Sequence, residues 1–264
     1  MATETNQGAK VTLYWLDKSR SQRIVWLLEE LKVDYELKVF KRGKDMLAPQ
    51  ELKDIHPLGK SPVIGVQAPG GEKPIIVAES AVIVEYLTEY FGKWMIPKRY
   101  PEGKEGVIGA ETEEWQRYRY YMHYAEGSFM TMLLMSLLTQ NMRNAPVPFL
   151  LKPIGMISGA IANKIDSSFV MPQIKGHLAF LEEQLTTAPN GGGFFCGNTL
   201  TGADIMMIFG LEGAMQRVPF TEQSHPNLYR WVIRMQERDA NKRAAERVSA
   251  ASGEPYVPIN KAKF

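Results

Sequence analysis

Cysteine and histidine are scarce in this chain. Its 264 residues include one cysteine, Cys196, so neither an internal disulfide, a CxxC redox pair nor a cysteine-rich zinc site can be built. The four histidines show no HExxH spacing, which disfavours metal catalysis of that kind. We therefore expect no metal site and a reducing compartment.

Long apolar runs and an excess of one charge are also lacking. The longest apolar stretch, residues 129–138, is far shorter than the ~20 residues that cross a bilayer. Residues 1–10 are too polar for a signal peptide. Basic residues number 31 and acidic residues 29, which is not the positive field of a nucleic-acid-binding protein. We expect a cytoplasmic protein without nucleic-acid partners and without stable membrane insertion.

The first part of the chain, residues 10–94, alternates strand and helix patterns. The strand-like segments, rich in branched residues or alternating in polarity, are 11–16, 35–40, 62–66 and 74–77. The segments with helical spacing of apolar residues are 24–31, 46–55 and 82–90. This order, βαβαββα, predicts an α/β domain with a mixed sheet, because the last two strands are too close for a crossover helix.

The second part of the chain is predicted to be all helical. Prolines and a glycine within residues 95–104 mark a linker, and residues 105–264 follow it. Apolar residues spaced by three and four from Trp115 to Met132 predict a long helix. The apolar but proline-broken segment 143–163 is expected to cover a cleft or to join an interface.

Three short segments of the first domain are suited to an anionic peptide. Ser19 is predicted to cap the first helix, where backbone N–H groups attract anions and stabilise a thiolate. Pro62 predicts a cis turn or an open strand edge beside Val63, at which an extended peptide can pair. Lys60 can meet a carboxylate, and Ser80 opens a further helix.

Each segment alone is explained as well by an ordinary cap or a solvated loop. Together they are expected to lie on one side of a small sheet and to offer a thiolate site, a strand edge and a carboxylate cradle. A short thiol peptide with free carboxylates satisfies all three, and glutathione is such a molecule.

The chain resembles the cytosolic glutathione transferases over nearly its whole length. The motifs that carry the resemblance are Ser19-Arg-Ser-Gln-Arg23, Pro57-Leu-Gly-Lys-Ser-Pro62, Glu79-Ser80, and the capping sequence from Thr199 to Ile205. Residues 123–130 are similar to a fungal and bacterial subgroup close to a yeast glutathione transferase. The resemblance implies a thioredoxin-like first domain, an all-α second domain and a homodimer.

The resemblance also implies where glutathione binds. The residues that it assigns to glutathione are Arg20, Lys60, Ser61, Pro62, Val63, Glu79 and Ser80. Lys60 is expected to bind the glycyl carboxylate. Pro62 is expected to be cis, and Val63 after it to pair with the cysteinyl backbone. Glu79 and Ser80 are expected to hold the γ-glutamyl end. Glutathione is then a co-substrate, and no cofactor is implied.

Two hydroxyls are candidates for activating the thiol. Ser19 lies in the position used by serine-type members of the family and Tyr14 in the position used by tyrosine-type members. We favour Ser19, and backbone N–H groups remain an alternative. The hydrophobic electrophile, or a peroxide in a glutathione peroxidase reaction, is expected over the second domain, against Tyr118, Tyr121, Met122 and Ser128.

Two other functions fit the same resemblance. A protein of this fold can bind glutathione or scaffold a complex without catalysis, because a fold does not determine an activity. It can also be a dedicated transferase of one biosynthetic pathway rather than a detoxification enzyme. The aromatic stripe of the second domain is equally consistent with helix core.

Overall fold

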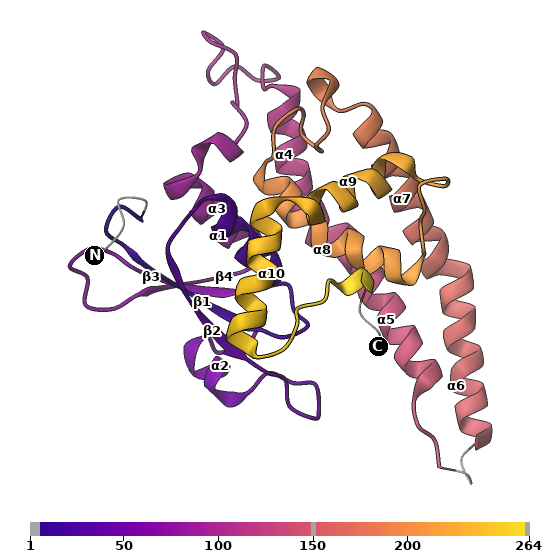
Figure 1. The fold of residues 1–264 in the computed structure, drawn as a ribbon. Helices are drawn as coiled ribbons and strands as arrows, with labels where there is room; N and C mark the ends of the chain where they lie inside the picture. The colour runs from indigo at the N-terminus through magenta and orange to yellow at the C-terminus, as the bar shows by residue number, and fades with distance from the viewer. Residues whose placement is uncertain (1–5, 149–151, 262–264) are drawn as a thin grey trace.

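A computed structural model describes residues 6–148 and 152–261 of the chain. Its first domain contains a four-stranded sheet with the order β2-β1-β3-β4 (Figure 1). The strands are β1 (Lys10–Leu16), β2 (Tyr35–Phe40), β3 (Val63–Gln67) and β4 (Ile75–Ala78). β1 pairs parallel with β2 and antiparallel with β3, and β3 pairs antiparallel with β4. The predicted mixed sheet is confirmed.

Three helices complete this domain in the predicted order βαβαββα. They are α1 (Gln22–Glu30), α2 (Gln50–Ile55) and α3 (Ser80–Phe91). Apolar side chains of α1 and α3 pack with Leu13 and Trp15 on one face of the sheet, in a core that continues into the second domain. On the other face, Leu52 of α2 packs with Tyr14 and Leu16.

The helix expected at 46–55 begins later than predicted, at Gln50. Met46 has a left-handed backbone with φ 62°, and the Leu47 N–H donates to the Asp45 carboxylate at 2.9 Å. Pro49 then precedes the first helical residue. A turn therefore replaces the first four residues of the predicted helix.

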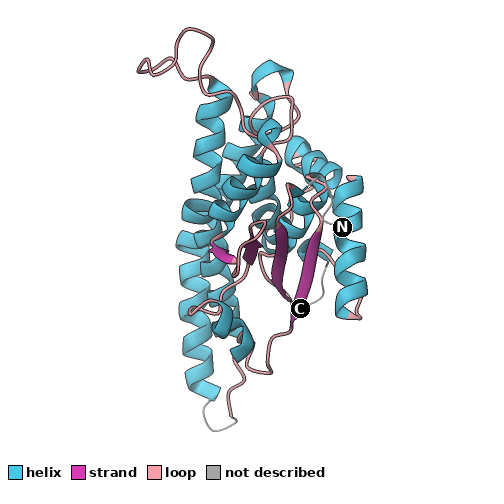
Figure 2. Ribbon diagram, turned by 90° about the vertical axis from the view of Figure 1, so that its left-hand side faces the viewer, coloured by secondary structure: helices cyan, strands magenta, loops and turns pink. Residues whose placement is uncertain are grey.

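The second domain is helical, as predicted, and stands beside the strands as a group of long helices (Figure 2). Its helices are α4 (Glu113–Tyr124), α5 (Met130–Asn144), α6 (Lys152–Ile165), α7 (Met171–Thr186), α8 (Gly202–Arg217), α9 (Pro226–Glu237) and α10 (Asp239–Ser252). In the part of the chain that the structure describes, none of the helices combines the length and apolar character needed to cross a bilayer.

Two π-helical turns interrupt the longest helices. One, Ala125–Phe129, joins α4 to α5, and the other, Asp166–Val170, joins α6 to α7. A π turn accommodates an extra residue without ending the helix and is frequent at functional sites. The two interrupted helices run antiparallel and side by side (Figure 1).

The apolar segment 143–163 divides between two helices. It contains the end of α5 and most of α6, and Pro153 lies in the first turn of α6, where a missing N–H costs no hydrogen bond. Residues 149–151 lie outside the described residues.

α8 is the most deeply buried helix of the second domain, and its predicted capping box is confirmed. The Thr201 N–H and hydroxyl both donate to Asp204 Oδ2 at 2.9 Å, and the Phe195 N–H donates to Oδ1 at 3.1 Å. Burial raises the pKa of Asp204, and these three donors oppose that shift. The box therefore ties the preceding loop to the helix.

Glu212 is a buried carboxyl group near the end of α8. It accepts a hydrogen bond from Gln236 Nε2 at 2.6 Å. Burial raises the pKa of Glu212 to about 7, against the opposing effects of Gln236 and Lys261. The folded protein therefore binds a proton here that the unfolded chain releases near pH 4.5.

We predict that the free energy of unfolding falls as the pH rises from 4.5 to about 7. A raised carboxyl pKa means that the folded state holds more protons than the unfolded chain. The free energy of unfolding therefore decreases by about 3 kcal/mol between pH 4.5 and the folded pKa of about 7, and it stays constant at higher pH. Glu212→Gln should remove this loss and be the more stable protein at pH 8. Urea unfolding at several pH values measures the difference, with Glu237→Gln, at an exposed position of α9, as the control. Parallel pH curves for wild type and Glu212→Gln would refute the assignment.

Candidate functional site

The loop between β1 and α1 holds Ser19 at the end of the first strand. The Ser19 hydroxyl donates to the Leu16 carbonyl at 2.7 Å, and its oxygen accepts the Ser21 N–H at 3.2 Å. The two serine hydroxyl oxygens are 2.6 Å apart. Ser21, not Ser19, is the residue before α1, so the prediction that Ser19 caps the helix is wrong. A left-handed Lys18, with φ 48°, adds a turn that the sequence pattern did not reveal.

Tyr14 points away from Ser19. Its ring lies on the α2 face of the sheet, 6.5 Å from the ring of Phe40. Its hydroxyl lies next to Gly65, 3.3 Å from the position that a β-carbon on that residue would take. Gly65 pairs with Thr12, which comes two residues before Tyr14 in β1. The hydroxyl is thus directed toward the start of β1, whereas Ser19 follows its end. The structure separates the two predicted catalytic hydroxyls.

The loop before β3 contains the expected cis peptide bond between Ser61 and Pro62. The Ser61 hydroxyl donates to the Tyr14 carbonyl at 3.1 Å, which fixes this loop to β1. Val63 pairs with Tyr14 on one side and with Ala78 on the other, so the prediction of an open edge at Val63 is wrong. β3 is an interior strand, and the backbone outside the ladder is that of residues 60–62. The Lys60 side chain is exposed.

Glu79 and Ser80 form the start of α3. Glu79 is exposed and has a left-handed backbone with φ 72°, an unusual conformation for a residue with a β-carbon. Ser80 is buried and is the first helical residue. The first N–H groups of a helix have no partner within it, so they can meet an anionic group.

The sheet register brings these three loops to one end of the sheet. Ala78 pairs with Val63, and Val63 pairs with Tyr14. Glu79, Pro62 and the residues that follow Tyr14 therefore continue from three adjacent strands in the same direction. The predicted glutathione-binding residues converge, and Ser19 lies in the loop that follows the central strand β1.

Arg23 connects this end of the sheet to the second domain. Its guanidinium is buried and donates to the Arg20 carbonyl at 3.3 Å, the Met206 carbonyl at 2.9 Å and Glu126 at 2.5 Å. Burial lowers the pKa of Arg23, and Glu126 opposes that shift. One side chain thus links the Ser19 loop, α8 and the π turn after α4.

Sequence reasoning assigned no role to Arg23 or Glu126. The one feature of the sequence that points to a buried cation is the position of Arg23 directly before the apolar residues 24–28. Arg20, predicted to bind glutathione, also pairs with Glu126, at 3.2 Å, and its side chain remains one-third exposed. Glu126 therefore holds two arginines of the α1 region.

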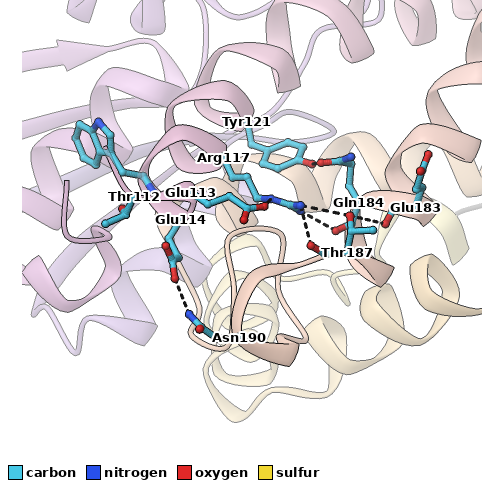
Figure 3. A network of polar contacts seen from close by, with 10 residues as sticks. Thr112, Glu113, Glu114, Arg117, Tyr121, Glu183, Gln184, Thr187 and Asn190 are labelled. Carbon is cyan, nitrogen blue, oxygen red and sulfur yellow. Dashed lines mark hydrogen bonds and ion pairs between the residues drawn. The ribbon is translucent and has the colours of Figure 1, made fainter. Parts of the chain in front are cut away.

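Three of the four residues predicted to line the second-substrate pocket lie in the core. Tyr118, Tyr121 and Met122 are at most 3% exposed. The Tyr121 hydroxyl donates to Gln184 of α7 at 3.2 Å, and Arg117 donates to the Gln184 carbonyl beside it (Figure 3). These bonds fix this face of α4 against α7. The burial of all three side chains is at odds with the prediction that they line an open pocket.

Ser128 differs from those three because it is exposed. It lines a cavity of about 570 Å³ on the outer face of α4, together with aromatic and charged residues. The other residues that the lining includes are Glu111, Trp115, Gln116, Arg119, Tyr120, His123, Tyr124 and Gly127. Within the described ranges, no three His, Cys, Asp or Glu side chains are grouped as metal ligands.

Comparisons with known proteins give consistent results. Models of the glutathione S-transferase N-terminal and C-terminal domains match residues 19–89 and 144–239. The chain is 28% identical over 240 residues to Glutathione S-transferase 1 of Saccharomyces cerevisiae, covering 91% of this chain and 96% of the relative. It is 30% identical over 239 residues to Glutathione S-transferase 3 of Schizosaccharomyces pombe, covering 90% and 88%.

A solved structure is also similar. The crystal structure of a glutathione S-transferase from Actinobacillus pleuropneumoniae has a TM-score of 0.62 and 26% sequence identity to this chain. The match covers 90% of this chain and 92% of that one.

We predict that Arg23→Met lowers the free energy of unfolding by about 2–3 kcal/mol, because the Met206 carbonyl loses a charged donor inside the protein. Arg20→Met is the matched control: it removes a partner of the same carboxylate from a more exposed position, so its cost should stay below about 1 kcal/mol. Urea unfolding of both variants measures the difference. Equal losses would show that Arg23 is not the connection described.

Proposed function

The chain belongs to the glutathione S-transferase family, a family of transferases, and we propose that it joins the sulfur of glutathione to an electrophilic carbon of an apolar substrate. The observation that carries this proposal is the convergence of the Ser19 loop, the Ser61–Pro62 turn and the start of α3 at one end of the sheet. A peroxide is a second proposed electrophile: the sulfur attacks one oxygen, the O–O bond breaks to release an alcohol, and the resulting sulfenic acid condenses with a second glutathione to a disulfide and water.

Glutathione is proposed to lie across these three loops. Lys60 is exposed and supplies a cation for the glycyl carboxylate. Glu79 supplies an anion for the γ-glutamyl ammonium, and the first N–H groups of α3 at Ser80 receive its carboxylate. Because both edges of Val63 are occupied, pairing with the cysteinyl backbone falls to Ser61. Glutathione is a co-substrate in this proposal, and no further cofactor is required.

Ser19 is proposed to stabilise the thiolate by donating a hydrogen bond to the sulfur. In the structure this hydroxyl donates to the Leu16 carbonyl. The Ser21 hydroxyl lies 3.2 Å from the same carbonyl and can satisfy it when Ser19 turns toward the ligand. A hydrogen bond to the charged form lowers the pKa of the thiol.

In the transfer step the thiol first loses its proton to water. The sulfur then uses an electron pair to form the carbon–sulfur bond, while the leaving group departs with the electrons of the bond that breaks. The electrophile is proposed to bind near Ser128, two residues from Glu126, in the cavity on α4, where Trp115, Tyr120 and Tyr124 supply aromatic surface. This position replaces the buried Tyr118, Tyr121 and Met122.

A second copy of the chain is a proposed partner. Apolar side chains are exposed on neighbouring parts of the first domain, at the edge strand β4, on α3 and just after it: Ile75, Ile76, Val82, Tyr90 and Trp94. Exposed apolar groups that adjoin one another are typical of interfaces. Their position supports a homodimer formed through this surface.

Replacing Ser19 tests the catalytic proposal. Ser19→Ala should lower the turnover of chlorodinitrobenzene about a hundredfold, because one donor to a developing charge is lost. Glutathione affinity by calorimetry should be unchanged, since Lys60, Glu79 and Ser80 remain. Tyr14→Phe is the matched control and should keep the wild-type rate.

Other results of this experiment select the alternatives. Retention on glutathione resin with no turnover of chlorodinitrobenzene or cumene hydroperoxide by the wild type would favour a binding or scaffold protein, which the engaged Ser19 hydroxyl also allows. A full rate in Ser19→Ala and loss in Tyr14→Phe would return the role to Tyr14.

Val82→Glu tests the dimer surface. A buried unpaired carboxylate at each side of the interface opposes association, so the variant should sediment as a monomer and the wild type as a dimer. Val107→Glu is the control, because Val107 and Val82 are both 49% exposed and Val107 lies away from α3 in the loop before α4. A monomeric wild type, or equal effects of both changes, would exclude this surface.

A further inference from the structure

A second cavity, of about 900 Å³, lies in the helical domain, away from the loops assigned to glutathione. It is formed by α5, by the region where α6 meets α7, and by the end of α8. None of the residues proposed for glutathione lines it. Its charged side chains are Arg143, Lys164, Arg217 and a single carboxylate, Asp166.

The one carboxylate of this cavity is already compensated. Asp166 accepts a hydrogen bond from the Thr139 hydroxyl at 2.6 Å and pairs with the Arg143 guanidinium. Asp166 is buried, so this arrangement fixes the π turn against α5. Among the described residues that line the cavity, three cationic side chains therefore face one carboxylate.

The Arg217 side chain is half-buried. Its guanidinium donates no hydrogen bond to any of the described residues. Burial lowers the pKa of Arg217, Asp166 opposes that shift, and the positive charge of Arg143 adds to it. An arginine in this position presents several N–H groups in a planar fork that matches an oxyanion.

Gln140 adds a second unused group. Its side-chain oxygen is buried and receives no hydrogen bond from the part of the chain that the structure describes. An unsatisfied buried acceptor is unfavourable. A ligand that satisfies it has to bring an O–H or N–H donor as well as a negative charge.

We propose that this cavity binds a small organic anion, an oxyanion head group that carries an adjacent hydroxyl or amine donor. The oxyanion lies against Arg217 and Lys164, and the donor reaches the Gln140 oxygen. The cavity is larger than a single phosphate ion, which leaves space for an organic substituent. The site is independent of the proposed glutathione site.

Inorganic phosphate is the probe, at pH 6, where it retains O–H donors, and sulfate is the comparison, because it has none at that pH. Isothermal titration calorimetry at constant ionic strength measures both with the full chain. Phosphate should bind more tightly than sulfate, and Gln140→Leu should remove most of that difference. Glycerol phosphate distinguishes the free ion from an organic phosphate, and tighter binding of the ester supports an organic ligand.

Variants locate the bound ion. Arg217→Ala should weaken phosphate binding about tenfold. Lys164 is exposed, so Lys164→Ala should leave folding intact and weaken phosphate binding severalfold. Arg230→Ala, an exposed arginine of α9, is the control and should bind as the wild type does.

Two results would overturn the proposal. One is phosphate binding of wild-type strength in both Arg217→Ala and Lys164→Ala. The other is displacement of phosphate by saturating glutathione together with its loss in Lys60→Ala, which would place the ion at the glutathione loops. Because glutathione uptake is measured separately, failure of this site and failure of the proposed function are distinguishable.

Discussion

The guanidinium of Arg23 is the interaction on which the arrangement of this protein depends. It is buried between the domains and donates to two backbone carbonyls and one carboxylate, from three different parts of the chain. A buried cation is tolerated only where such partners are provided. The Ser19 loop therefore takes its position relative to the helical domain from a polar contact, in addition to the apolar core that the domains share. Glu126 is presented to it from a π turn.

The C-terminal helix adds a second polar connection between the domains. Arg238 pairs with Glu30 at 2.5 Å, and Arg243 pairs with Glu29 at 3.1 Å. The Arg247 guanidinium lies 3.7 Å from the centre of the Tyr35 ring. α10 thus packs against α1 and β2, and the basic residues near the end of the chain neutralise acidic residues of the first domain.

The sequence pattern predicted the order of elements well and the geometry of the site less well. Strands and helices follow from periodicity, and the capping box of Thr201 and Asp204 follows from residue type, because both depend on local interactions. The position of β3 inside the sheet could not be predicted, since strand order depends on pairing between distant segments. Periodicity also cannot tell a core-facing tyrosine from a pocket-facing one, and the Gln184 contact that decides the matter for Tyr121 is 63 residues away.

The two π turns have a consequence for how this domain can change. Each residue of an α-helix advances the side chains by about 100° around the axis. Deleting one residue within 125–129 would restore a regular helix and rotate all of α5 by that angle relative to α4. The exposed Leu134 and Leu137 would take the angular positions that the buried Leu133 and Ser136 now occupy. Length variation at this one position is therefore a route by which relatives with similar sequences can present different surfaces to their surroundings.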